Sequence, residues 1–130
     1  MKKGFTLVEI LVAVVIVATL ATIAIPRMLK GRQKISQRQA ESYLRSIRVS
    51  QKMYYARFAQ YACQTVACSG ASAVKSTLGT VMRDGSYTFS VLASGANSFV
   101  ATANGGALGT ITIDESGNFQ KDATPYTPPS

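Results

Sequence analysis

The feature that most constrains this chain is an apolar run near its start. Phe5–Ile25 spans 21 residues and contains one charged side chain, Glu9. At about 1.5 Å per residue, a helix of this length covers roughly 30 Å, about the thickness of the hydrocarbon core of a bilayer. A carboxylate in the middle of such a helix costs roughly 2.5–3.5 kcal/mol, so Glu9 needs a partner. The run predicts a membrane-spanning helix, and its single charge indicates a role beyond anchoring.

The formal net charge of +8 belongs to the N-terminal half of the chain. Residues 1–65 carry 11 Lys and Arg against two Glu, whereas residues 66–130 carry three basic residues against four acidic ones. Histidine is absent and there are two cysteines, which excludes a zinc or haem site built from His and Cys. We expect no metal, no cofactor and no enzymatic activity.

The orientation of the span is ambiguous from composition. Cys63 and Cys68, downstream of the span, favour export and a disulfide; the alternative is two free thiols in a reducing compartment. The positive-inside rule favours the opposite orientation, because the basic residues after the span outnumber those before it. These residues are Lys2 and Lys3 before it, and Arg27, Lys30, Arg32 and Lys34 after it. The run is longer than a usual signal-peptide core and lacks an Ala-x-Ala site after it, so we expect the span to stay in the mature protein.

An amphipathic helix is expected over residues 26–61, continuous with the apolar run across Pro26. Proline there removes one backbone donor and should bend or loosen the helix. The apolar positions fall on one arc of a helical wheel, with Gln51 at the one missing step. They are Ala40, Tyr43, Leu44, Ile47, Tyr54, Phe58 and Tyr61.

A stripe of basic residues occupies another arc of the same helix. It consists of Arg27, Lys30, Lys34, Arg38, Arg45, Arg48 and Lys52. Glu41 lies within this basic stripe at helical spacing from Arg38 and Arg45, so we expect it to meet one of them. The stripe is either a solvated face or a surface for anionic partners such as phospholipid headgroups, DNA or neighbouring subunits.

The rest of the chain predicts a connecting loop, residues 62–85, and an antiparallel sheet with a tail, residues 86–130. A short turn of helix is expected at Ala71–Leu78 within the loop. Alternating residues and tight turns predict three to four strands, around Tyr87–Leu92, Phe99–Ala103, Ile111–Ile113 and Phe119. We expect Tyr43, Ile47, Tyr54 and Phe58 to pack on one face of this sheet. The tail PYTPPS is expected to be extended or loose. The fold class is therefore α+β, a long N-terminal helix on a C-terminal antiparallel sheet.

The stretch Gly4-Phe5-Thr6-Leu7-Val8-Glu9, after a short basic leader, resembles the processing motif of type IV pilin precursors. The long helix, the loop and the sheet with its GTITIDESGN stretch are similar to that family along the whole chain. The resemblance implies a leader (residues 1–4), a span and filament-core helix (residues 5–25), cleavage between Gly4 and Phe5 by prepilin peptidase, and N-methylation of Phe5. It also implies a cytoplasmic leader, an exported C-terminal domain, and polymerisation into an extracellular filament by the pilus assembly machinery.

In such a filament Glu9 gains a partner, because cleavage creates a cationic amine at Phe5. Pairing with the amine of an adjoining subunit offsets the burial of Glu9 and favours one register. The alternatives are a protonated Glu9, or a pair with the Phe5 amine of its own chain. The family often has a mid-span glycine where this chain has Ala18, which favours helix by about 1 kcal/mol over glycine. Pro26 still supplies a break that assembly can use.

Three functions follow from this reading. The first is a structural pilus subunit, serving adhesion, twitching motility or DNA uptake. The second is a pseudopilin of the type II secretion system; a C-terminal calcium site of the kind found in one subfamily would need more clustered acids than Asp114, Glu115 and Asp122 provide. The third, a DNA-binding minor pilin, is not favoured, because the C-terminal domain carries only Lys75, Arg83 and Lys121 and no aromatic-basic repeat.

Overall fold

The computed structural model describes residues 4–83 and 85–129, apart from the side chains of Pro26 and Arg27. One helix, α1, runs from Leu7 to Phe58 over 52 residues and continues through Pro26. The chain divides into two compact units, one ending at Lys34 and one beginning at Ile35, and α1 contributes to both. The two units are described separately below.

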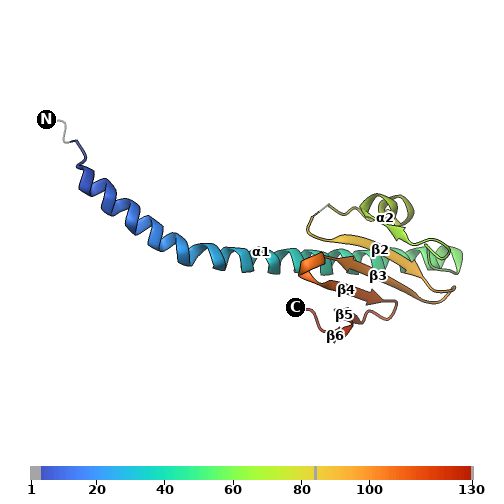
Figure 1. Cartoon of the computed structure of the whole chain (residues 1–130). Coiled ribbons are helices and arrows are strands. Elements are labelled where there is room, and N and C mark those ends of the chain that lie inside the picture. The colour runs from blue at the N-terminus through green and yellow to red at the C-terminus, as the bar shows by residue number, and fades with distance from the viewer. Residues whose placement is uncertain (1–3, 84, 130) are drawn as a thin grey trace. The chain divides into compact units, whose positions relative to one another are not determined.

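The second unit combines the C-terminal half of α1 with a six-stranded sheet in which every neighbouring pair is antiparallel and the strands follow chain order (Figure 1). The strands are β1 (Cys68–Ser69), β2 (Thr88–Ala93), β3 (Phe99–Asn104), β4 (Thr110–Asp114), β5 (Phe119–Lys121) and β6 (Thr124–Tyr126). A short helix, α2 (Ala71–Leu78), lies between β1 and β2, and a 3-10 turn, η1 (Gly106–Leu108), joins β3 to β4. The predicted α+β fold and the helix at Ala71–Leu78 are confirmed.

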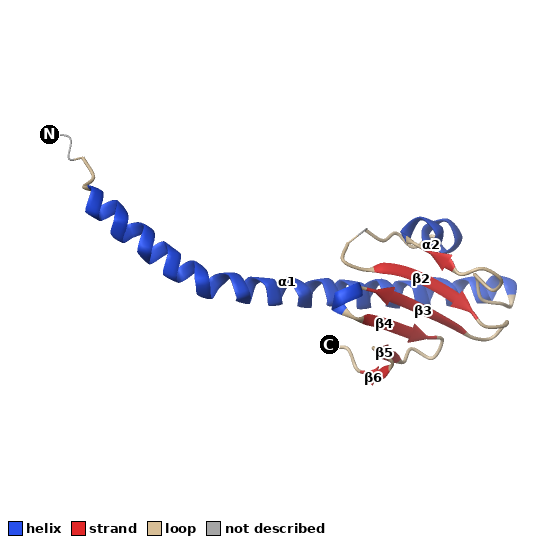
Figure 2. Ribbon diagram, viewed as in Figure 1, coloured by secondary structure: helices blue, strands red, loops and turns tan. Residues whose placement is uncertain are grey.

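The sheet forms because its strands alternate apolar and polar residues, as the sequence predicts. In β2 and β3 every second side chain is buried, and the same period continues in β4. These buried side chains face the C-terminal half of α1, which runs along the sheet in Figure 2. The sheet has two strands more than the largest number expected, β1 and β6. Both are short edge strands without an alternating pattern of their own, so only pairing with β2 and β5 defines them.

The packed face of α1 differs from expectation at its C-terminal end. Ile47 is buried, and Tyr43 meets the ring of Phe89 edge-on, with centroids 5.6 Å apart. Phe58, by contrast, is 57% exposed, so its predicted packing on the sheet is wrong. The helix ends at Phe58, and Tyr61 folds back into the core instead, where its ring lies 4.8 Å from that of Phe99.

Gln51, the one polar residue at an apolar step of the helix, is fully buried. Its Oε1 accepts a hydrogen bond from the backbone N–H of Ala62 (2.9 Å), and its Nε2 donates to the Ala62 carbonyl (3.2 Å). Because both polar atoms are paired, the amide is buried without an unsatisfied group. Gln51 thus holds the chain that leaves α1 against the helix, a role that sequence reasoning missed. The sequence signal for this role was the position of Gln51 within the apolar arc of the helix.

Part of the basic stripe serves the fold itself. The guanidinium of Arg45 lies 5.5 Å from the centroid of the Phe119 ring. That of Arg48 donates to the carbonyls of Glu115 (3.2 Å) and Ser116 (2.8 Å), in the turn between β4 and β5. A Cβ on Gly117, which has a φ of 96°, would come within 2.9 Å of Arg48 Cζ. The backbone angle favours glycine there, and a Cβ would also require the guanidinium of Arg48 to shift.

A polar cluster of Gln37, Glu41, Lys121 and Tyr126 joins α1 to the last two strands. The Tyr126 hydroxyl donates to Glu41 Oε1 (2.9 Å), and Gln37 Nε2 donates to both the hydroxyl (2.8 Å) and Glu41 Oε1 (3.1 Å). Lys121 Nζ donates to Gln37 Oε1 (3.1 Å). Glu41 therefore takes Tyr126 and Gln37 as partners where Arg38 or Arg45 was expected. Of the two expectations for the tail, extended or loose, Tyr126 fits the first: it lies in strand β6, and this pairing brings its hydroxyl to a buried carboxylate.

We expect Tyr126→Phe to lower the free energy of unfolding by about 1.5–3 kcal/mol, as for a hydrogen bond to a charged group. Burial, followed by the bond to Glu41, raises the pKa of Tyr126 above its usual value of 10.0. The stabilisation is therefore complete below pH 10 and is lost as the pH rises through the folded-state pKa. Unfolding of the full chain in detergent, followed from pH 7 to pH 12, should show a shallower alkaline decline for this variant.

Part of that decline should persist in Tyr126→Phe, because burial and the charges of Glu41 and Asp122 also raise the pKa of Tyr87. The matched control is Tyr55→Phe, which removes an exposed hydroxyl bonded to Asn97 at 3.3 Å. An equal loss of stability in both variants would contradict a special role for the Tyr126–Glu41 bond.

Candidate processing and assembly site

The start of α1 is defined by Thr6. Its Oγ1 accepts a hydrogen bond from the backbone N–H of Glu9 (3.2 Å), and its carbonyl accepts from the N–H groups of Glu9 and Ile10. This is the geometry of an N-cap, in which a threonine hydroxyl satisfies one of the free donors of the first turn. The spacing Thr-x-x-Glu is that of a capping box, a local signal that the sequence interpretation did not use. The helix therefore begins at Leu7, immediately after its cap.

Gly4 lies before the helix, exposed and outside regular secondary structure. A Cβ built on Gly4 meets no atom within 4 Å, and its φ lies outside the left-handed region that favours glycine. Nothing in the described part of the chain therefore requires glycine at this position. A requirement for glycine would have to come from a molecule that acts on this segment.

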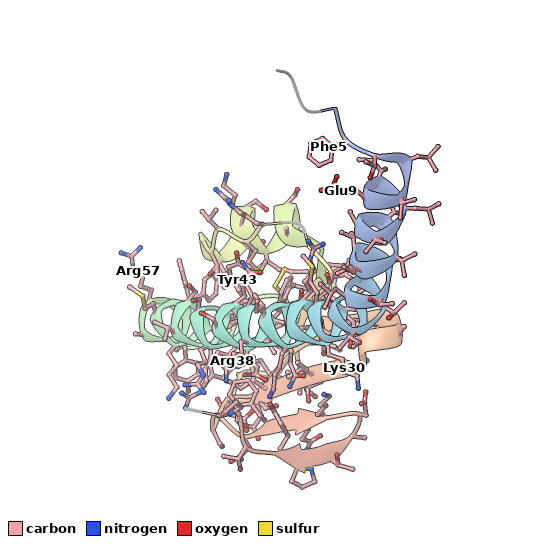
Figure 3. All side chains as sticks on the ribbon, turned by 90° about the vertical axis from the view of Figure 1, so that its left-hand side faces the viewer. Phe5, Glu9, Lys30, Arg38, Tyr43 and Arg57 are labelled. Atoms are coloured by element: carbon pink, nitrogen blue, oxygen red, sulfur yellow. A yellow bond between two sulfur atoms is a disulfide. The ribbon has the colours of Figure 1, made fainter. Side chains whose placement is uncertain are left out.

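Phe5 and Glu9, both labelled in Figure 3, lie together at the N-terminal end of α1. Phe5 is 78% exposed, and Glu9 is exposed in the first turn of the helix. In a mature chain that begins at Phe5, the new amine would be one helical turn from the carboxylate. The predicted processing residues and Glu9 are thus close together in the first unit.

The apolar surface of the first unit is uncovered in the single chain. The large apolar side chains between Phe5 and Ile25 are each 52–79% exposed. α1 is long and apolar enough to cross a membrane, with a mean hydropathy of 2.7 in its most apolar window. Such a surface is stable only against a bilayer or against other protein, since exposed apolar area is costly in water.

The middle of the span is helical without interruption. α1 continues through Ala18, the position where a glycine would favour unwinding, and through Pro26. The hydroxyl of Thr22 donates to the carbonyl of Thr19 (2.7 Å), and that of Thr19 donates to the carbonyl of Ile16 (2.8 Å). These two polar side chains are therefore satisfied within the helix, which makes them compatible with an apolar environment.

Cys63 and Cys68 form a disulfide, as one of the two interpretations of their spacing predicts. The loop that they close is attached to the sheet at both ends. The Cys63 carbonyl accepts from the N–H of Ala93 (3.0 Å), and Cys68 pairs with Val91 in the first ladder of the sheet. The disulfide thus joins the return from α1 to the edge of the sheet.

Comparison with known proteins extends these observations. Residues 1–25 match the prokaryotic N-terminal methylation motif. The chain is 28% identical over 120 residues to the type IV wide pilus major component PilA4 of Thermus thermophilus, an alignment that covers 91% of this chain and 86% of that protein. It is 33% identical over 60 residues to the type IV major pilin protein PilA of Myxococcus xanthus, covering 46% of this chain and 27% of that protein.

The methylation motif, the long apolar helix and the antiparallel sheet together are the features expected of a structural subunit of the pilin type. The chain therefore carries the N-terminal methylation motif and is similar over most of its length to a type IV pilus component. Both relatives are named as major components of type IV pili.

Proposed function

We propose that this chain is the precursor of a type IV pilus subunit, cleaved between Gly4 and Phe5, N-methylated at Phe5 and polymerised through its N-terminal helix. The observation that carries the proposal is the uncovered apolar surface of Phe5–Ile25, with Glu9 as its only charge. A bilayer covers this surface in the precursor, and the helices of neighbouring subunits cover it in the filament. A single helix can meet both requirements because lipid tails and apolar side chains are similar environments.

Processing is supported by the form of the segment around Gly4. Proteolysis requires an accessible, unstructured peptide bond, and this one lies just before the N-cap of α1. Glycine gives a peptidase close access to the scissile bond, which explains a glycine that the fold itself does not need. The partner for cleavage and N-methylation is prepilin peptidase, which also carries the methyltransferase activity.

The disulfide supports one orientation of the span. A domain with a Cys63–Cys68 bond matures in an oxidising compartment, so we place residues after the span in the periplasm and the leader in the cytoplasm. The subunit is then held in the inner membrane before the pilus assembly machinery moves it into an extracellular filament. This placement overrides the simple count of basic residues on the two sides of the span.

Assembly requires a partner for Glu9. In a bundle of staggered helices, the carboxylate of one subunit pairs with the Phe5 amine of the next, and any other register leaves a charge unpaired in an apolar core. Pro26 serves assembly by removing one backbone donor from α1, so that the helix can adjust where it leaves the bundle.

The test is a deletion strain examined by electron microscopy, together with mass spectrometry of sheared filaments. We expect the strain to lack filaments, and wild-type filaments to contain a chain that begins at Phe5 and is one methyl group heavier than the unmodified product. Normal filaments in the deletion strain, with loss of protein secretion, would replace the proposal by a type II secretion pseudopilin. Normal filaments with loss of DNA uptake alone would indicate a DNA-binding minor pilin.

A further inference from the structure

Beyond Arg27, whose side chain lies outside the described part of the structure, three more basic residues follow the apolar span: Lys30, Arg32 and Lys34, here called the basic collar. All three side chains are exposed and lie on α1 within the first unit. Lys30, labelled in Figure 3, and Lys34 are four residues apart and share one face of the helix, whereas Arg32 points to the opposite side of a helical wheel. The collar therefore presents positive charge around the helix and not on a single face.

The sequence around the collar offers these charges no acidic neighbour. There is no Asp or Glu between Glu9 and Glu41, so the collar has no opposite charge at i±3 or i±4. The collar differs in this respect from Arg48, whose guanidinium bonds the carbonyls of Glu115 and Ser116.

The distance from the span places the collar at a membrane surface. If Ile25 marks the edge of the hydrocarbon core, Lys30 lies about 7.5 Å and Lys34 about 13.5 Å further along the helix axis. The headgroup region of one leaflet is about 5–8 Å thick. Lys30 thus lies at headgroup level, and Lys34 lies within a Debye length of about 8 Å from its outer edge. Long basic side chains also reach back toward the interface.

We propose that the basic collar binds the phosphates of anionic phospholipid headgroups while the precursor is anchored in the membrane. Arg32 offers a guanidinium fork that suits a phosphate, and the two lysines add point charges. The inference rests on the membrane-anchored precursor of the proposed function. Lipid binding also explains why the chain carries basic residues after the span, although the proposed orientation exports them against the positive-inside rule.

A second copy of the chain is a weaker candidate for these charges. The described acidic side chains of the C-terminal domain already accept hydrogen bonds from their own backbone. Asp114 accepts from Gly117 and Asn118, Glu115 from Phe99, and Asp122 from Thr110. If the collar of a second copy paired with these carboxylates, part of these turn and strand hydrogen bonds would be lost. A lipid phosphate can pair with the collar without such a loss.

The test uses the full chain in nanodiscs made from equal parts of phosphatidylglycerol and phosphatidylcholine, with native mass spectrometry of the lipids that leave with the protein. The variant is Lys30→Gln, Arg32→Gln and Lys34→Gln together. The matched control removes three exposed charges of the second unit: Lys52→Gln, Lys75→Gln and Arg83→Gln. Each basic residue near an anionic surface contributes about 1 kcal/mol, or about fivefold.

We expect phosphatidylglycerol to be enriched over phosphatidylcholine on the wild type and on the control, and this enrichment to fall at least about fivefold on the collar variant. Raising the salt from 0.15 M to 1 M should shorten the Debye length from about 8 Å to 3 Å and reduce the enrichment. Wild-type enrichment on the collar variant would overturn the proposal. So would a collar variant that keeps the enrichment and loses filaments, since the collar would then serve contacts between subunits.

Failure of the proposed function would look different. A wild-type chain that alkaline carbonate strips from membranes would contradict the anchored precursor itself, and the collar with it. A chain that stays in the membrane but shows no lipid enrichment would contradict only the collar.

Discussion

Glu9→Gln should abolish filaments while leaving export and cleavage intact. The amide has nearly the size of the carboxylate but no charge, so the Phe5 amine of the neighbouring subunit loses its counter-ion in an apolar core. Removing one partner of a buried pair costs about 3–5 kcal/mol, which corresponds to a loss of roughly 100-fold or more in subunit association. The measurement is the yield of sheared filaments, with the membrane fraction probed for cleaved chain.

The structure makes glutamine the informative substitution. Thr6 and Glu9 have the spacing of a capping box, a motif that takes glutamine as well as glutamate at its second position. If Glu9 served only to begin the helix, Glu9→Gln would assemble normally and Glu9→Ala would not. Filaments at wild-type yield from the glutamine variant would therefore contradict the charge pair and support the cap. The control is Thr19→Ala, which removes a polar group already satisfied by the Ile16 carbonyl and should assemble normally.

Gly4→Val should block maturation and leave the fold unchanged. A valine side chain beside the scissile bond should displace it from the catalytic groups of the peptidase, and a misplacement of about 1 Å can cost 100-fold in rate. We expect the membrane fraction to contain a chain that retains residues 1–4, lacks methylation and forms no filaments. Mass spectrometry of the intact chain gives the ratio of precursor to product.

A substitution at Gly4 should affect processing without affecting folding, because no other atoms lie close to this residue. A Cβ at Gly4 meets nothing within 4 Å, so the variant should keep the Cys63–Cys68 disulfide and the unfolding transition of the wild type. Gly31→Ala is the matched control: it too adds a Cβ that meets nothing within 4 Å, within α1, and should be cleaved normally. Cleaved, methylated product at wild-type level from Gly4→Val would refute the processing site.

Features that depend on local sequence were predictable. The apolar span follows from composition alone, and β2, β3 and β4 follow from residues that alternate between core and solvent. The pair Cys63–Cys68 was an open choice, since spacing and compartment favour a disulfide without excluding free thiols. The processing motif around Gly4 and Phe5 is also local, and the match to the methylation motif lies within residues 1–25.

Features that depend on long-range pairing were not predictable. Glu41 has basic residues at helical spacing on both sides, yet its hydrogen bonds come from Gln37 and from Tyr126, which is 85 positions further along the chain. Phe58 continues the apolar arc of α1 but is exposed, because Tyr61 occupies the core after the helix has ended. Periodicity describes one element at a time, and in both cases a second element decided the contact.

The sequence by itself determined the N-terminal span, the cap of α1 and the alternation that builds the sheet, because each arises from residues that are neighbours along the chain. Only the tertiary structure decided which basic residues remain available. Arg48 serves the β4–β5 turn and Arg45 lies over Phe119, whereas the basic collar stays exposed. The physical reason is that a side chain's partners depend on strand register and on where the strands lie against the helix, which no local pattern encodes.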